Sequence, residues 1–230
     1  MTLTLSLLAG IAIAWVLVAT VDRLRFGIDA GQALLYVPFK LAYRISDGRI
    51  QVARKAPPPV IYAIVHQSRL EPALMLSLLP TDTLHILDPD SARSAWLEPW
   101  RALGRTIAFN AEHIFVSRRL VRVLKGRGRL AVYFPDDPEP DAKALRLYRA
   151  VARIAMQADA GIVPIFVGGA RHLPFSLAPA GGTRRRLFPH LAINVLKPMT
   201  VAEMTAAAND PSAPVRKVLF DRISEARSPP

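Results

Sequence analysis

Short apolar runs alternate with helical patterns along most of the chain. The runs lie at 60–65, 83–87, 106–109, 129–134, 162–167 and 191–196. Their length and their content of β-branched residues predict buried β-strands. Amphipathic or apolar helical patterns lie between and after them, at 72–79, 92–103, 113–125, 143–158 and 214–226. This alternation predicts an α/β domain over residues 55–227, with a mainly parallel or mixed sheet flanked by helices.

The most hydrophobic stretch is the N-terminus, where no residue from Leu3 to Val21 is charged. A helix of about 19 residues, rising about 1.5 Å per residue, just spans a hydrocarbon core. We interpret residues 1–27 as a membrane anchor. A cleaved signal peptide is an alternative, but only the α-amine supplies positive charge before the apolar stretch. A buried core helix is the other alternative, and the stretch is long for one.

Positive charges follow this stretch at Arg23 and Arg25. The positive-inside rule therefore places the body of the protein on the cytoplasmic side of the inner membrane. Residues 28–54 form a separate segment whose apolar residues do not fall on one clean helical stripe, and Pro38 would kink a helix there. An interfacial helix anchored through Tyr36, Phe39 and Tyr43 and a helix packed on the domain are both open interpretations.

The composition limits the kinds of partner that the protein can be expected to bind. The chain has 230 residues, a net charge of +12 and no cysteine, which excludes disulfides and thiolate zinc sites. A basic and hydrophobic protein suits nucleic acid or an anionic membrane surface. Nucleic-acid binding would need aromatic residues among the basic ones, but only 7% of residues are aromatic and a membrane span competes. We therefore expect a lipid bilayer as partner, and no nucleic acid.

Candidate catalytic residues lie at the end of the first predicted strand. His66 ends that strand, and Glu71 follows before Pro72, which suits the first turn of a helix. The carboxyl end of a strand is the usual place for chemistry in an open α/β sheet. A carboxylate that reaches the imidazole Nδ1 leaves Nε2 free to take a proton from a hydroxyl. The alternative is that His66 has only a structural role at the end of the strand.

Several blocks in order resemble the glycerolipid (lysophospholipid) acyltransferase family. The family's Asn-His-x4-Asp block corresponds to Val65-His66-x4-Glu71, and its Phe-Pro-Glu-Gly block to Phe134-Pro135-Asp136-Asp137. Its Val-Pro strand corresponds to "GIVPIFV". The segment "DAGIVPIFVGGARHLPFSLAPAGGTRRRLFPHLAINVLKP" is similar to the acyltransferase part of bifunctional acyl-carrier-protein synthetase/acylglycerophosphoethanolamine acyltransferases. The resemblance covers about residues 55–200.

The resemblance implies transfer of an acyl chain from a thioester, on coenzyme A or acyl-carrier protein, to the hydroxyl of a lysophospholipid. It implies that His66 is the general base and that Glu71 orients it, with no cofactor and no metal ion. The Phe134-Pro135-Asp136 turn would bind the glycerol side of the acceptor. The cations expected to hold the acceptor's phosphate are Arg69, Arg146, Arg184, Arg185 and Arg186.

The sequence departs from the family pattern in its acids. Glu71 is one methylene longer than the family's Asp, and Asp136 is one methylene shorter than its Glu. Asp137 replaces a glycine and adds charge beside an anionic substrate. The alternative function that these changes raise is a catalytically degenerate relative that binds lipid or a partner enzyme.

Overall fold

The computed structural model describes residues 2–108, 114–178, 183–208, 210 and 212–227. Its central β-sheet contains every predicted strand. Its strands are β1 (Val60–His66), β2 (Thr83–Leu87), β3 (Arg105–Ala108), β4 (Arg129–Pro135), β5 (Gly161–Gly168) and β6 (Ala192–Val195). Their order in space is β3-β2-β4-β1-β5-β6. The first five strands run parallel, and β6 pairs with β5 in the antiparallel direction. The expected mixed sheet is confirmed.

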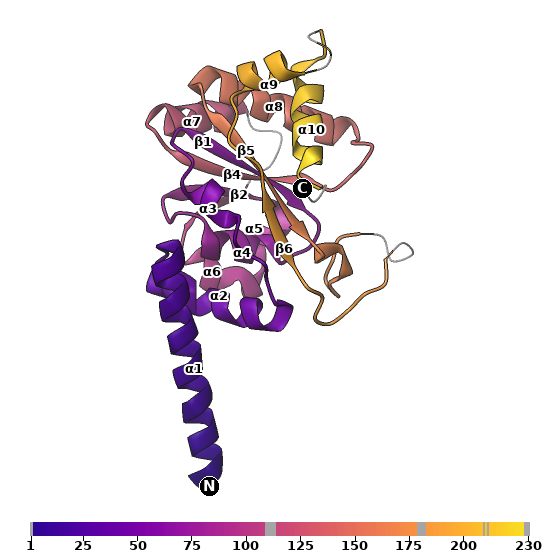
Figure 1. Cartoon of the computed structure of the whole chain (residues 1–230). Coiled ribbons are helices and arrows are strands. Elements are labelled where there is room, and N and C mark those ends of the chain that lie inside the picture. The colour runs from indigo at the N-terminus through magenta and orange to yellow at the C-terminus, as the bar shows by residue number, and fades with distance from the viewer. Residues whose placement is uncertain (1, 109–113, 179–182, 209, 211, 228–230) are drawn as a thin grey trace.

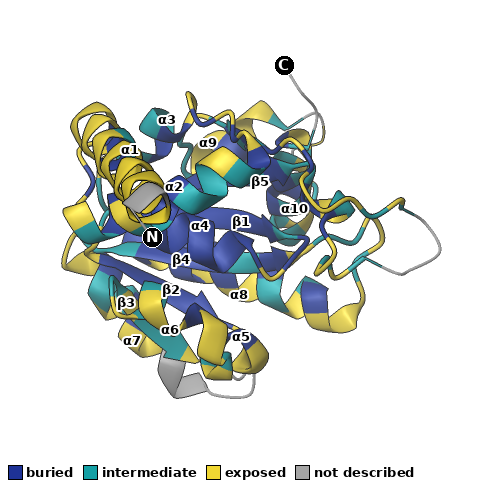
Figure 2. Cartoon of the chain, turned by 90° about the horizontal axis from the view of Figure 1, so that it is seen from below, coloured by how far each residue is buried: buried dark blue, intermediate teal, exposed yellow. Residues whose placement is uncertain are grey.

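Helices cover both faces of this sheet, which explains why the central strands are apolar throughout. Residues of β1 alternate between the two main cores, with Tyr62 in one and Ile61 in the other. Figure 1 shows the two helical layers above and below the sheet, and Figure 2 shows the buried strands between them. One layer consists of α7 (Ile114–Lys125), α8 (Ala142–Ala158), α9 (Val201–Ala207) and α10 (Val215–Glu225). The other contains α2 (Ala30–Tyr43), α3 (Ile50–Arg54) and α4 (Glu71–Leu78).

The prediction of a single helix at 92–103 is wrong. The chain there forms α5 (Pro89–Arg93), a 3-10 turn at Ala95–Leu97 and α6 (Glu98–Arg101). Asp88 caps α5 one turn earlier than expected, because its side chain accepts a hydrogen bond from the Ser91 backbone N–H. Pro99 is tolerated only near a helix start, since it has no N–H to donate. A second 3-10 turn, Ala170–His172, follows β5.

Two short helices, α3 and α9, were absent from the sequence-based prediction. Helix α3 ends at Arg54, shortly before the three prolines at 57–59. The signal for α9 is present in the sequence. Thr200 and Glu203 form a reciprocal capping box, in which each side chain bonds the other residue's backbone N–H. Residue 113, the expected start of α7, lies outside the described residues.

The N-terminal helix α1 (Thr2–Phe26) projects from the layer that contains α2 (Figure 1). Its segment Thr4–Phe26 has a mean hydropathy of 2.2 and is long and apolar enough to cross a membrane. Only 6% of its most apolar window is buried inside the protein, so it is no core helix. Most of its residues are exposed, so the ribbon of α1 is mainly yellow in Figure 2.

Helix α2 continues through Pro38 and packs on the body of the protein. Tyr36 and Val37 are completely buried, and Tyr43 is nearly so. Gln32 is also buried, and its side-chain amide donates to the carbonyls of Leu76 and Leu79 at the end of α4. These contacts support the packing interpretation of residues 28–54. An interfacial helix anchored through Tyr36 and Tyr43 is wrong, because those rings face the core.

Buried charges join α1 to α2. Asp47 lies in the turn after α2 and is 3% exposed; its carboxylate accepts a 2.7 Å hydrogen bond from the Tyr36 hydroxyl. Lys40 lies 3.3 Å from Asp47 and also bonds Asp22 of α1, while Arg25 reaches Asp47 at 3.3 Å. This cluster fixes where α1 leaves the body, because a buried carboxylate is stable only while its cations and donors stay in place.

We predict that Asp47→Ala lowers the free energy of unfolding by about 3 kcal/mol, because Lys40 and the Tyr36 hydroxyl lose their buried acceptor. Thermal or denaturant unfolding in a neutral detergent micelle measures this loss. The matched control is Asp82→Ala, which removes the exposed ion pair with Arg129 and should cost less than about 1 kcal/mol. Equal losses in the two variants would contradict a special role for the cluster.

Candidate active site

The predicted base lies at the carboxyl edge of the parallel strands. His66 is the last residue of β1 and stands opposite Pro135, the last residue of β4. The chain then turns through Gln67 and Ser68 and enters α4 at Glu71, with Pro72 in the first turn. Strand, turn and helix thus place His66 and Glu71 at the same edge, as the sequence predicted.

Glu71 holds this turn together. Its side chain is fully buried, and one carboxyl oxygen accepts hydrogen bonds from the backbone N–H groups of Gln67 and Ser68, each at 3.1 Å. The other oxygen accepts from the Ser68 N–H and the Ser68 hydroxyl, each at 2.8 Å. The additional methylene of glutamate therefore lets the carboxyl group fold back over the turn.

The same carboxyl group lies next to the imidazole without bonding it. His66 Nδ1 is 3.7 Å from the Glu71 Oε2 atom, which is too long for a hydrogen bond. Nδ1 is buried and has no other partner among the described residues. The His66 side chain is 13% exposed, so its accessible part faces outward from the turn. A shift of several tenths of an ångström would complete the contact that the resemblance implies.

Burial shifts both groups toward their neutral forms. Desolvation lowers the pKa of His66, and the Asp88 carboxylate opposes this only in part. Desolvation raises the pKa of Glu71 to about 8, although the hydrogen bonds from its own backbone, Ser68 and Gln67 lower it. His66 is therefore unprotonated at neutral pH, as a general base must be. The close pair is then a neutral imidazole beside a carboxyl group that ionises only near pH 8, rather than an ion pair.

Tyr133 and His85 form a wall beside the base. The Tyr133 ring meets the His66 ring edge to face, with 5.7 Å between centroids. Its hydroxyl lies 3.0 Å from His85 Nδ1 on the neighbouring strand β2. Burial lowers the pKa of His85 to about 3 and raises that of Tyr133 well above its usual range, with Glu71 and Asp88 adding to the rise. Both side chains are thus neutral.

A cleft of about 790 Å³ opens beside His66. Its cations are Arg69, Arg93 and Lys143, and Asp88 and Asp90 supply its acidic side. Trp96, Leu97 and Leu177 give it an apolar wall, and Pro89, Ser91 and Ser94 complete the lining. The cleft therefore combines a neutral imidazole, cationic side chains and an apolar surface. Within the described part of the chain, no three histidine, aspartate or glutamate side chains gather as a metal-ion site.

Asp136 is next to this cleft but already has partners. Its carboxylate accepts a 2.6 Å hydrogen bond from the Gln67 side-chain amide and lies 3.1 Å from both Arg171 and Arg227. Asp136 thus ties the end of β4 to the β1–α4 turn and to the end of α10. Phe134 is completely buried and packs on Tyr148, with 4.7 Å between ring centroids. Pro135 is exposed at the strand end.

The predicted phosphate-binding cations are only partly brought together. Arg69 lines the cleft, whereas Arg146 is exposed on α8 outside it, and Lys143 takes the place nearer the base. The guanidinium of Arg185 donates to the backbone carbonyls of Arg171, Leu173 and Ala178 and so holds a loop. Its neighbours at positions 184 and 186 are exposed away from the cleft lining. The expected arginine run at 184–186 is therefore not part of this cleft.

Sequence reasoning missed Asp88, Tyr133 and Lys143 as neighbours of the base. A signal for Asp88 exists: it directly follows a predicted strand and precedes a proline, so it lies at the same sheet edge as His66. Tyr133 lies inside an apolar strand and carries no such signal. Lys143 reaches the cleft only because α8 starts beside it.

Comparisons with known proteins support the fold. No protein-family model matches the chain. A solved structure with a similar fold is the 1-acyl-sn-glycerophosphate (LPA) acyltransferase PlsC from Thermotoga maritima, with a TM-score of 0.55 and 15% sequence identity. The match covers 86% of this chain and 80% of that chain. At this identity the likeness shows the fold alone: a mixed six-stranded sheet flanked by helices.

We predict that Glu71→Ala lowers the free energy of unfolding by about 3 kcal/mol, because the buried N–H groups of Gln67 and Ser68 lose their acceptor. Glu71→Gln keeps one carbonyl oxygen in place and should cost about half as much. Equilibrium unfolding of the two variants in detergent measures both values. Unchanged stability in Glu71→Ala would show that the carboxyl group does not hold the turn.

Proposed function

We propose that this protein transfers an acyl chain from a thioester to the hydroxyl of a lysophospholipid or related glycerolipid at a membrane surface. The observation that carries the proposal is His66, held unprotonated at the mouth of a cleft with cationic and apolar walls. The ordered family blocks support it, as does the fold shared with a protein named as a lysophosphatidic acid acyltransferase.

The reaction needs only a base, a positioned hydroxyl and a thioester. His66 Nε2 accepts the proton of the lipid hydroxyl while its oxygen attacks the thioester carbonyl. The carbon–sulfur bond of the tetrahedral intermediate then breaks, and the imidazolium returns the proton to the leaving thiolate. Glu71, 3.7 Å from Nδ1, stabilises the imidazolium when it is ionised. No covalent enzyme intermediate is required, which suits a chain without cysteine.

The cleft provides for both substrates. Arg69 and Lys143 are suited to the phosphate of the acceptor, with Arg93 further along the lining. Trp96, Leu97 and Leu177 offer the apolar contacts that an acyl chain or glycerol backbone requires. Phe134 supports the turn from within, and Asp136 positions Gln67. The co-substrate is acyl-coenzyme A or an acyl-carrier protein, and no other cofactor is part of the proposal.

Helix α1 supports the proposed membrane location. As a single span entered from the cytoplasmic side of the inner membrane, α1 would keep the body at the surface where lysolipids reside. The cluster of Asp22, Lys40 and Asp47 would then hold the body at a fixed position relative to the span.

The second candidate is a catalytically silent relative that binds lipid. The observations that favour it are the missing hydrogen bond between His66 and Glu71 and the full engagement of Asp136 by two arginines. Turnover by the wild-type protein on any lysolipid excludes this candidate. Restoration of activity by Glu71→Asp in an inactive wild type would establish it.

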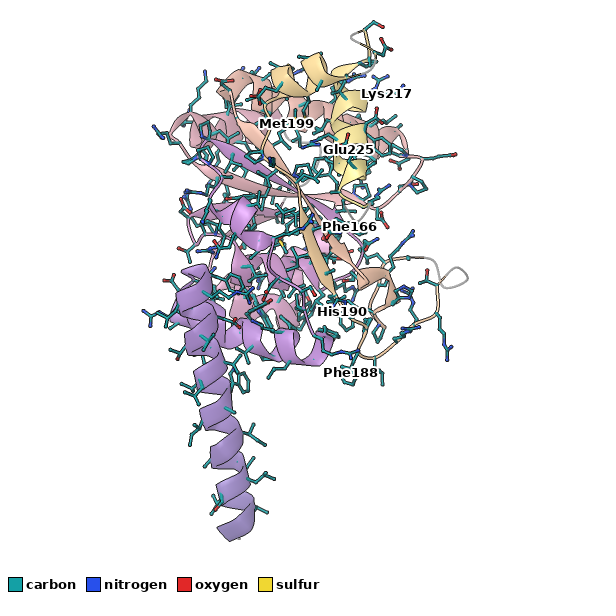
Figure 3. The ribbon with its side chains drawn as sticks, in the orientation of Figure 1. Phe166, Phe188, His190, Met199, Lys217 and Glu225 are labelled. Atoms are coloured by element: carbon teal, nitrogen blue, oxygen red, sulfur yellow. The ribbon has the colours of Figure 1, made fainter. Side chains whose placement is uncertain are left out.

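We predict that His66→Ala lowers acyl transfer at least about 100-fold, because the base is lost. The assay combines the full chain in mixed micelles with a panel of lysolipids and both acyl donors, and circular dichroism checks that the variant is folded. His190→Ala is the matched control: His190 is exposed near Phe188 on the loop before β6 (Figure 3), and its ring contacts Ser46 and does not line the cleft. Equal activity in wild type and His66→Ala would refute the proposal.

We predict that kcat/KM rises in two steps as the pH increases. Because burial lowers the pKa of His66, kcat/KM should first rise with a midpoint below pH 6.5, where the imidazole loses its proton. Because burial raises the pKa of Glu71 to about 8, a second rise should follow near that pH, as the carboxylate forms beside Nδ1. Glu71→Gln should keep the first rise and lose the second. A single rise shared by both proteins would show that Glu71 ionisation does not assist the base.

A further inference from the structure

An exposed basic surface covers α7 and α8, which pack side by side over the same face of the sheet. On α7 its members are Arg118, Arg119, Arg122 and Lys125. On α8 they are Lys143, Arg146, Arg149 and Arg153. Each set lies opposite the buried residues of its helix, so both point away from the core. We call these eight side chains the basic face.

The two helices that carry the basic face contain no acidic residue that could neutralise its positive charge. Neither Ile114–Lys125 nor Ala142–Ala158 contains an aspartate or glutamate. Among the described residues, no ion pair involves any of the eight side chains, although other surface cations are paired, such as Arg222 with Glu225. The acids nearest to the α8 members in sequence, Asp141 and Asp159, cap the two ends of α8. Glu112, the acid nearest to α7, lies outside the described residues. Such a concentration of like charge is repulsive in the free protein and favours an anionic partner.

The position of the basic face separates it from the proposed membrane surface. Helices α7 and α8 belong to one layer, whereas α1 projects from the opposite layer in the opposite direction (Figure 1). A bilayer that holds α1 therefore lies beyond the other face of the sheet. The partner that reaches the basic face comes from solution.

The basic face is continuous with the cleft. Lys143, in the first turn of α8, both belongs to the basic face and lines the cleft beside His66. From Lys143 to Arg153 the face extends about 15 Å along α8, at about 1.5 Å per residue. A partner docked along α8 therefore has one end at the cleft. This length, with α7 added, exceeds what the phosphates of one nucleotide can cover.

We propose that the basic face docks an acidic carrier protein, which presents its acyl thioester to His66 through the end of the cleft marked by Lys143. The inference rests on the proposed acyl transfer and assigns its donor: the thioester sulfur belongs to a protein-bound thiol. In the reaction the thiol leaves on the carrier and the acyl group passes to the lipid hydroxyl, so no other reactant is required. Docking through charge predicts salt-sensitive binding and fast association.

The test uses the full chain in neutral detergent micelles, with a purified acidic acyl-carrier protein loaded with a long-chain acyl group and, separately, the same acyl group on coenzyme A. The variant carries Arg122→Glu and Arg149→Glu, one reversal on each helix and neither in the cleft lining. The matched control carries Arg49→Glu and Lys55→Glu, which are exposed at the two ends of α3 in the opposite layer.

We expect the variant to weaken carrier binding, measured by calorimetry, at least about tenfold, because attraction at two sites becomes repulsion. Its KM for the acyl-carrier protein should rise by a similar factor, while its KM for acyl-coenzyme A and its kcat stay unchanged. The control variant should bind the carrier like the wild type. Rising salt should weaken wild-type binding and have less effect on the variant.

The inference is overturned if the variant binds the carrier as tightly as the wild type, or if both variants lose affinity equally. It is also overturned if the basic face binds RNA or anionic vesicles while the carrier does not bind. Binding is measured separately from turnover, so the two proposals can fail independently. Carrier binding through the basic face without transfer from either donor would refute the acyl transfer but support the docking surface.

Discussion

The carboxyl group of Glu71 is the interaction on which the candidate site depends. A strand that is buried on both faces ends at His66, and the chain must turn at once into α4. The turn leaves backbone N–H groups at Gln67 and Ser68 without partners, and buried donors are costly when unpaired. Glu71 satisfies them from the first turn of α4. The same group that makes the turn possible therefore lies beside the imidazole, 3.7 Å from Nδ1.

This double use of one side chain determines the electrostatics of the site. Full burial disfavours the charged form of Glu71, and the same burial disfavours a protonated His66. The site consequently holds a neutral base at physiological pH, close to an acid that ionises slightly above it. The glutamate that departs from the acyltransferase motif is thus the residue that supports the turn.

The two helical layers have different roles in the proposed function. The layer with α2 and α4 carries α1, and the buried cluster around Asp47 fixes that helix to the body. The layer with α7 and α8 presents cations toward solution. The candidate cleft lies at the strand ends between them, with His66 from β1 and Lys143 from α8 in its lining. A lipid acceptor and a soluble donor could thus approach the base from different sides.

The sequence by itself determined the strands, the apolar N-terminal helix and the location of His66 and Glu71 at one strand end. These features depend on local patterns: apolar runs of strand length, an uncharged helix, and a histidine followed by an acid across a strand–helix turn. Sequence reasoning failed at the helix 92–103, because the cap at Asp88 and the proline at position 99 outweighed its apolar spacing.

Only the tertiary structure decided which side chains surround the base. Tyr133 and Asp88 lie at the ends of β4 and β2, which the strand order β2-β4-β1 brings next to His66, whereas Lys143 reaches the cleft from the first turn of α8. Arg184 to Arg186 lie outside the cleft lining, and Asp136 meets Arg171 and Arg227. The physical reason is that distance along a chain does not determine distance in space. Sheet order and helix packing do, and both result from long-range burial that no local pattern records.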